Sequence, residues 1–174
     1  GVSRANNQLN ESVQSATNYY NRGQYFEAAE ACQNYLQQHN GGNADLYNIM
    51  SSAYLSLKNW SGSEKAALQA LQIAPDFRWA RINLSLARTA DRLDGAVKYH
   101  GQGRYRESIA VCEQVIKVAP DNPMAYNLLS ADYIGLQDWT NAVAAAQQAL
   151  AIAPRYESAL SNFNLAKSRL DVAK

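Results

Sequence analysis

The side chains of this chain that could do chemistry are few and lie far apart in the sequence. It has two histidines, His39 and His100, and two cysteines, Cys32 and Cys112. A catalytic or metal site needs several such groups converging on one point, and no Cys, His, Asp or Glu cluster here has the spacing of metal ligands. Two cysteines make no disulfide framework, so we expect buried structural thiols. These residues predict neither an enzyme nor a cofactor.

The other motifs with a chemical interpretation are weak. The segment 40–42 reads Asn-Gly-Gly, but it follows a predicted helix, so it is interpreted as a turn and not as a phosphate-binding loop. His100 lies near the end of a predicted helix, where it is either an ordinary turn residue or a contact to a ligand. Four arginines form a stripe that is either a solvated helix face or a dock for an acidic peptide. They are Arg78, Arg81, Arg88 and Arg92.

Composition and charge exclude several classes of protein. The 174 residues are 47% hydrophobic, enough to bury a core. The formal net charge of +1 gives no bulk attraction to nucleic acid. No apolar run reaches the ~18 residues that would predict a membrane-inserted segment. The chain begins at Gly1 without Met, and we interpret it as a piece of a longer protein, with its compartment left open.

The elements that would position a site are repeated pairs of helices. Residues 47–75 read YNIMSSAYLSLKNWSGSEKAALQALQIAP, and residues 126–154 read YNLLSADYIGLQDWTNAVAAAQQALAIAP. Within each copy, apolar and small residues recur at i, i+3, i+4 and i+7, which is typical of helices. A turn with an aromatic residue divides each pair, and an Ala-Pro sequence ends it. One hairpin cannot cover its own apolar face, so the copies are predicted to stack.

This pattern resembles the tetratricopeptide repeat (TPR), a 34-residue helix-turn-helix. In that register, repeats occupy about 9–42, 44–77, 89–122 and 123–156. The residues that carry the resemblance are the small residues Ala16, Ser51, Ala96 and Ser130, the tyrosines Tyr19, Tyr54, Tyr99 and Tyr133, and the second-helix small residues Ala28, Ser63, Ser108 and Ala142. The resemblance implies an all-α fold, an alpha-alpha superhelix (TPR solenoid) of about four hairpins.

The repeats fall into two similar modules. Residues 78–88 are extra relative to the repeat length, and they resemble residues 157–167 at four positions. We therefore predict a first module over 1–88 that ends in a linking helix at 78–88. A second module over 89–174 is predicted to end in a capping helix at 157–172.

A long central helix is predicted to join the two modules. No Gly or Pro occurs from Arg78 to Leu93. We expect one helix from about Phe77 to about His100, with Gly95 as the position most prone to a bend.

The resemblance implies a non-catalytic scaffold that binds a protein or an extended peptide on the concave face, which the first helices of the hairpins line. Mapping the family's contact positions onto this chain gives Tyr20, Asn48, Ser52, Trp79, Ile82, Leu86, Val97, His100, Asn127, Ala131 and Ile134. Asn48 and Asn127 are favoured, because an amide that recurs in both modules can hold a peptide backbone. Their alternative is a local hydrogen bond. For Trp79, Ile82 and Leu86 the alternative is packing against the next helix.

Two further interpretations stay open. The two-hairpin-plus-helix module also looks like the C-terminal soluble region of some larger bacterial proteins. On that view the chain is an accessory domain of a membrane-anchored enzyme such as a glycosyltransferase-like protein. The second is a homo-oligomer formed through the helix from Trp79 to Leu86 or through the terminal helices. A chaperone-type carboxylate clamp is disfavoured, since Val13 replaces the clamp lysine and Asp45 would repel a carboxylate.

Overall fold

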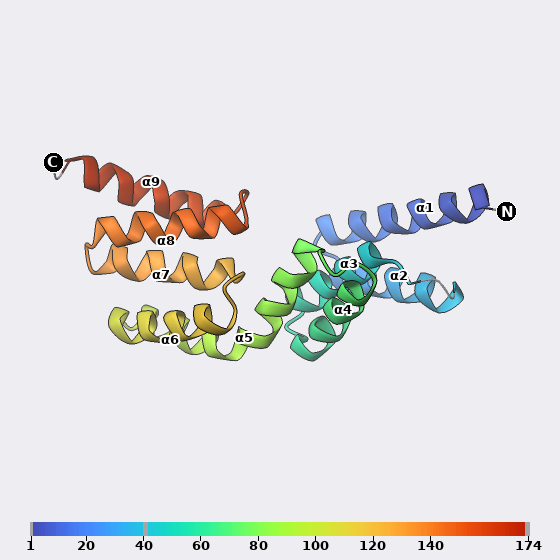
Figure 1. The fold of residues 1–174 in the computed structure, drawn as a ribbon, viewed down its shortest axis with the longest axis horizontal. Coiled ribbons are helices and arrows are strands. Elements are labelled where there is room, and N and C mark those ends of the chain that lie inside the picture. The colour runs from blue at the N-terminus through green and yellow to red at the C-terminus, as the bar shows by residue number, and fades with distance from the viewer. Residues whose placement is uncertain (1, 40–41, 173–174) are drawn as a thin grey trace. The chain divides into compact units, whose positions relative to one another are not determined.

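The computed structural model describes residues 2–39 and 42–172, and within these ranges the chain forms nine α-helices and no strand (Figure 1). Consecutive helices pair as antiparallel hairpins. The predicted all-α fold of four hairpins and a last helix is therefore confirmed.

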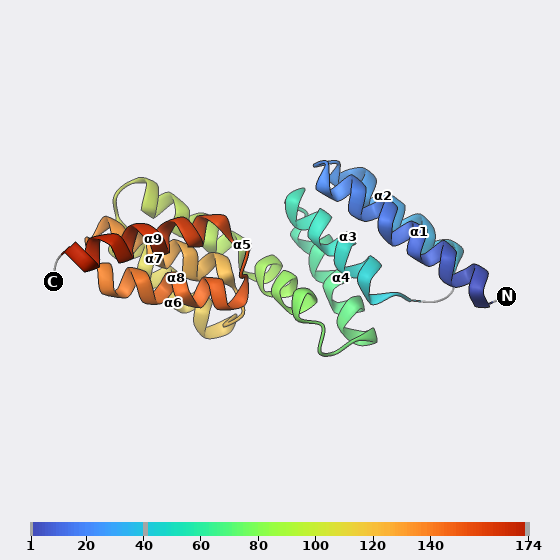
Figure 2. The ribbon, with the colours of Figure 1, turned by 90° about the horizontal axis from the view of Figure 1, so that it is seen from above.

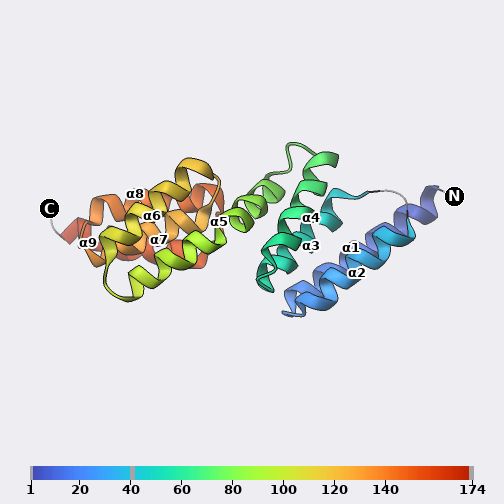
Figure 3. The ribbon, with the colours of Figure 1, turned by 90° about the horizontal axis from the view of Figure 1, so that it is seen from below.

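The first half of the chain contains two complete hairpins. Helix α1 spans Val2–Asn21 and pairs with α2, Tyr25–Gln38. Helix α3 spans Ala44–Ser56 and pairs with α4, Trp60–Ile73. Figure 2 shows the two hairpins as neighbouring pairs, and Figure 3 shows the same pairs from the opposite side. Helix α1 begins earlier than the repeat predicted at residue 9. Residues 4–8 are exposed, so this part of the helix has no periodic apolar pattern in the sequence.

The second half repeats this arrangement. Helix α5 spans Arg78–Gly101, and α6, Tyr105–Val118, follows it. Helix α7, Pro123–Gly135, pairs with α8, Trp139–Ile152, and α9, Glu157–Val172, packs against both. Helix α5 runs without interruption through Gly95, which confirms the long helix expected from the sequence.

The chain divides into two compact units, Gly1–Arg88 and Thr89–Lys174. The boundary between them falls inside α5 and not in a loop. Each unit has its own buried core of small and branched side chains. We call the surface formed by α1, α3 and residues 78–88 the first-helix face of the first unit, and the surface formed by residues 89–101, α7 and α9 that of the second.

The four hairpin turns share one backbone feature. A residue with positive φ stands two positions before each turn aromatic: Gly23 at 75°, Lys58 at 57°, Gly103 at 72° and Gln137 at 59°. Glycine adopts this conformation without the steric cost that Lys58 and Gln137 carry. The aromatic then opens the second helix, as the sequence pattern predicts.

Small residues let the two helices of a hairpin approach closely. Ala16, Ser51, Ala96 and Ser130 are all fully buried. The Ser51 hydroxyl donates to the Ser63 carbonyl at 2.9 Å, and the Ser130 hydroxyl donates to the Ala142 carbonyl at 2.8 Å. Each hydroxyl thus satisfies its hydrogen bond across the hairpin it helps to close.

Candidate functional site

The favoured site residue Asn48 lies at a junction between α3 and α5. Its Oδ1 accepts a hydrogen bond from Nδ2 of Asn83 at 3.1 Å, and the same Nδ2 lies 2.9 Å from the hydroxyl of Ser52. Asn83 is 7% exposed, whereas Asn48 and Ser52 are half-buried. The structure therefore brings Asn48 and Ser52 together and adds Asn83, a partner that the predicted site did not include.

The second unit has the same junction between α7 and α9. Nδ2 of Asn162 donates to Oδ1 of Asn127 at 3.0 Å and lies 3.3 Å from the Asn127 carbonyl. Ala131 stands where the first unit has Ser52, so the third contact is absent here. Burial raises the pKa of Tyr156, and the nearby amide of Asn127 opposes that shift. Asn127 therefore has a phenol as neighbour as well as an amide.

The apolar members of the predicted site have different environments. Trp79 is 47% exposed and Val97 is 46% exposed. Leu86 is half-buried, and Ile82, at 4% exposed, is a packing residue. The burial of Ile82 favours the alternative that it packs against a neighbouring helix.

Tyr20, Ala131 and Ile134 are half-buried. The Tyr20 ring makes an edge-to-face contact with Tyr25, 5.2 Å between centroids, and packs on the alanines between α2 and α3. Tyr20 thus contributes to hairpin packing as well as to the surface.

His100 is joined to a buried carboxylate. Its Nδ1 lies 2.7 Å from Oδ1 of Asp132, which is fully buried on α7. The second oxygen, Oδ2, and the buried Ser108 hydroxyl make no hydrogen bond of ordinary geometry within the described residues. Burial raises the pKa of Asp132, while the Ser108 hydroxyl and the His100 imidazole oppose that shift. The contact fixes the orientation of the imidazole.

In the first unit, the position that corresponds to the His100–Asp132 contact is occupied mainly by apolar side chains. The repeat register aligns His100 with Tyr20, Ser108 with Ala28 and Asp132 with Ala53. Ala28 and Ala53 form a buried cluster on which Tyr20 packs. All three positions differ between the two units. The same hairpin junction is therefore filled by apolar packing in the first unit and by a polar cluster in the second.

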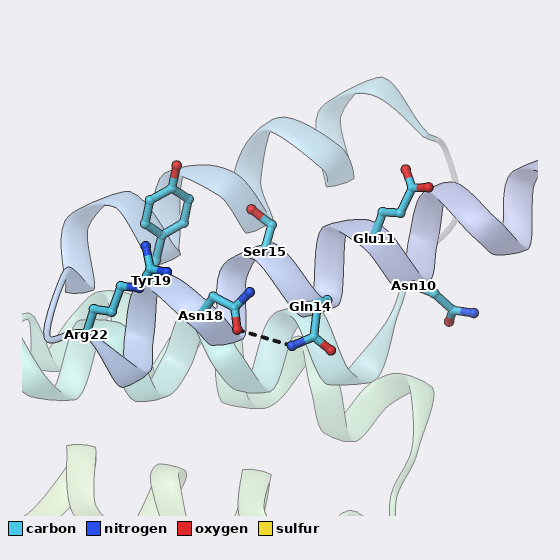
Figure 4. Close-up of a pocket in the computed structure, with 7 residues that line it drawn as sticks. All are labelled: Asn10, Glu11, Gln14, Ser15, Asn18, Tyr19 and Arg22. Atoms are coloured by element: carbon cyan, nitrogen blue, oxygen red, sulfur yellow. Dashed lines mark hydrogen bonds between the residues drawn. The ribbon is translucent and has the colours of Figure 1, made fainter.

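Two other surfaces are hollowed. The first is an open polar face of α1, and Figure 4 shows Gln14 there, donating to Asn18 at 3.1 Å. Six of its seven lining residues lie on α1, and the seventh, Arg22, directly follows the end of that helix, so it is the exposed side of one helix and not an enclosed pocket. The second, of about 380 Å³, is a groove between α2 and α4 with α3 as its floor.

Both cysteines are free and fully buried, as predicted. Burial raises the pKa of each thiol to about 12. Within the described residues, no three or more Cys, His, Asp or Glu side chains gather as metal ligands would. In the same part of the chain, no helix is both long and apolar enough to cross a bilayer.

The sequence profile described as Tetratricopeptide repeat matches residues 93–157. Residues 93–157 belong to the tetratricopeptide repeat family. Its structure is similar to TTC0263, a thermophilic TPR protein of Thermus thermophilus, with a TM-score of 0.55 and 20% identity over 93% of this chain and 84% of the other. This likeness extends the tetratricopeptide repeat fold to the first unit.

Other solved structures are more distant. MamA (41-end) from Desulfovibrio magneticus RS-1 has a TM-score of 0.45 and 18% identity, covering 93% of this chain and 85% of its own. The first TPR of Spaghetti (RPAP3), bound to the HSP90 peptide SRMEEVD, has a TM-score of 0.41 and 13% identity, covering 74% and 93%. No curated protein matches the chain.

Two features of the candidate site could not be predicted from the sequence alone. The partners of Asn48 and Asn127 are Asn83 and Asn162, and the only signal was that both pairs recur with one separation. For the burial of Asp132, the one indication in the sequence is that the aligned residue of the first unit is Ala53.

Proposed function

We propose that this protein is a non-catalytic scaffold that binds an extended segment of a partner protein on its first-helix faces. The amide pair Asn48–Asn83 carries the proposal. The shared hydrogen bond uses the oxygen of Asn48 and the nitrogen of Asn83. A primary amide has both a donor and an acceptor, so Nδ2 of the half-buried Asn48 remains to donate to a C=O group of a peptide. An extended peptide offers such groups along its length.

The first unit is the stronger candidate of the two. In the second unit, Asn127 has Tyr156 as a neighbour, and the repeat register places Phe77, which has no hydroxyl, at the position of Tyr156. Asn48 therefore lacks the phenol partner that Asn127 has within its own chain. Trp79, nearly half exposed on the same unit, is suited to anchor an apolar side chain of the peptide.

The test separates binding from stability. In Asn48→Asp, the carboxylate keeps the oxygen that accepts from Asn83 but removes the donor nitrogen. A peptide selected from a display library by the full chain is expected to bind this variant about tenfold more weakly, because a donor to the peptide is lost and a charge is added. Asn34→Asp, an exposed change of the same charge on α2, is the control and is expected to bind normally.

Calorimetry gives the affinities, and backbone amide shifts locate the peptide. Equal affinity for Asn48→Asp and the original chain would contradict the proposal, as would shifts confined to α2 and α4. Sedimentation with and without the peptide tests self-association through the helix from Trp79 to Leu86.

We also infer that the chain is a tandem duplication of two hairpins plus a helix. The support is that the same amide junction joins the middle first helix to the last in each unit.

A further inference from the structure

The groove between α2 and α4 is a second surface, separate from the first-helix face. Its floor comes from α3, where Tyr47, Met50 and Tyr54 stand at i, i+3 and i+7 on one side of the helix. Their spacing makes an apolar strip about 10 Å long at ~1.5 Å per residue. The volume of about 380 Å³ lies within the range of pockets that take up a bulky group.

The floor is held in place by the fold itself. Met50 packs on the buried clusters of the first unit, and Tyr54 packs on one of them, so both side chains are anchored from below. Leu36 of α2 continues the apolar surface on one wall, and Ala66 of α4 continues it on the other. The groove therefore exists before anything binds.

The rim of the groove is polar and carries a single charge. Its amides are Gln33 and Gln37 on α2 and Gln69 on α4, and its one ionic group is Lys65. Lys65 is exposed, and no ion pair to it occurs within the described residues. A cation at the edge of an apolar strip with no carboxylate among the lining residues is complementary to an acidic occupant.

Comparison of the two units shows that the residues of the groove floor recur in the second unit, whereas those of the rim do not. The repeat register aligns Tyr47 with Tyr126, Tyr54 with Tyr133 and Ala66 with Ala145. At the rim, however, Gln33 aligns with Glu113, Gln37 with Lys117 and Lys65 with Ala144. A packing requirement common to both hairpins would account for the floor. It does not account for the rim, which has a cation and no carboxylate in the first unit but both Glu113 and Lys117 in the second.

We propose that the α2–α4 groove is a docking site for a short acidic segment of a partner protein, which places one bulky apolar side chain on Tyr47, Met50 and Tyr54 and a carboxylate against Lys65. The glutamines bind its backbone from both walls. The site is independent of the first-helix face, so one chain can hold two segments at once.

The experiment uses the full chain labelled with ¹⁵N and two blocked pentapeptides. Both have a central tryptophan, flanked by glutamates in one and by lysines in the other. The acidic peptide is expected to shift the backbone amide signals of Tyr47, Tyr54 and Ala66, and the basic peptide to leave them in place. Lys65→Glu is expected to weaken binding of the acidic peptide about tenfold. Lys98→Glu, an exposed lysine on α5, is the charge-matched control.

A graft provides a gain of function. The triple variant Glu113→Gln, Lys117→Gln, Ala144→Lys transfers the rim to the second unit, where the acidic peptide should then shift Tyr126 and Tyr133 as well. Equal shifts from both peptides, unchanged binding by Lys65→Glu, a graft without effect, or no shift at about 5 mM peptide would each overturn the proposal. Shifts confined to the first-helix face would overturn it and leave the proposed function standing.

Discussion

Nδ2 of Asn83 lies 3.1 Å from Oδ1 of Asn48, and Nδ2 of Asn162 lies 3.0 Å from Oδ1 of Asn127. In each unit the bond connects two first helices that no turn joins directly. Because Asn83 is almost fully buried, its amide cannot exchange this partner for water without opening the helix contact. The amide pairs thus fix the spacing of the helices that form the proposed binding face.

Replacing Asn83 by Ala is expected to destabilise the first unit by about 1–3 kcal/mol, because the acceptor groups of Asn48 and Ser52 lose their donor. Urea denaturation followed by tryptophan fluorescence measures the change. Asn164→Ala, an exposed asparagine on α9, is the control, with an expected effect of about 0.5 kcal/mol or less. An unaltered midpoint for Asn83→Ala would show that the pair contributes nothing to stability.

Two glycines with equally open surroundings are expected to respond oppositely to alanine. A Cβ at Gly95 or at Gly103 would meet no atom within 4 Å, but only Gly103 has a positive φ, 72°. Gly95→Ala removes flexibility from the interior of α5 and should stabilise by about 0.5–1 kcal/mol. Gly103→Ala should destabilise by about 1 kcal/mol. Thermal denaturation distinguishes them, and a shift in one direction for both would refute this explanation.

Asp132 is expected to make stability depend on pH. Burial raises its pKa, so the folded chain holds this proton more tightly than the unfolded chain does. Its contribution is therefore most favourable below pH 3.8, the ordinary carboxyl pKa, and is lost as the pH rises through the raised value. Asp132→Asn should be more stable than the original chain at neutral pH, and this advantage should vanish in acid.

The pH dependence of the difference is the measurement, since other carboxyls titrate in both proteins. Asp91→Asn, an exposed position on α5, should give no such dependence. His100 keeps contact with solvent, so it can replace the lost carboxylate with water. A variant that is less stable at every pH would mean that the His100–Asp132 contact outweighs the cost of burying the charge.

The thiols of Cys32 and Cys112 are expected to resist alkylation at pH 8 in the folded protein. Only the thiolate reacts, and burial raises both pKa values to about 12. Mass spectrometry after iodoacetamide treatment should show no adduct without urea and two adducts with it. Ser161→Cys adds an exposed thiol that should react at once. Rapid native labelling of Cys32 or Cys112 would reveal local opening of its hairpin.

Much of the fold could be predicted because the packing rules are repeated in the sequence. The buried Ala16 and Ser51 stand at a position where helices meet, and only small residues permit that approach. The Ala-Pro sequences end α4, α6 and α8 within two residues of the proline. The early start of α1 was not predictable, because residues 4–8 are exposed and under no packing constraint.

The site was less predictable because it depends on contacts between distant residues. Periodicity identifies Asn48 as surface-facing, yet it cannot show that Asn83 lies opposite. It also assigned Ile82 to a contact face, although the side chain is buried. Asp132 lies at a position that packing reserves for small or apolar groups, and only its distance to His100 shows how a carboxylate is tolerated there.

Helix α5 has a consequence for how the protein melts. Its backbone hydrogen bonds run unbroken across the boundary between Arg88 and Thr89, so neither unit has a natural end at that point. When one unit unfolds, the part of α5 that remains in the other unit ends in a frayed turn, where backbone carbonyl or amide groups have lost their hydrogen-bond partners. Unfolding of the two units should therefore be coupled, as it is between neighbouring repeats in a solenoid. Cleavage of the peptide bond between Arg88 and Thr89 should lower the stability of both units.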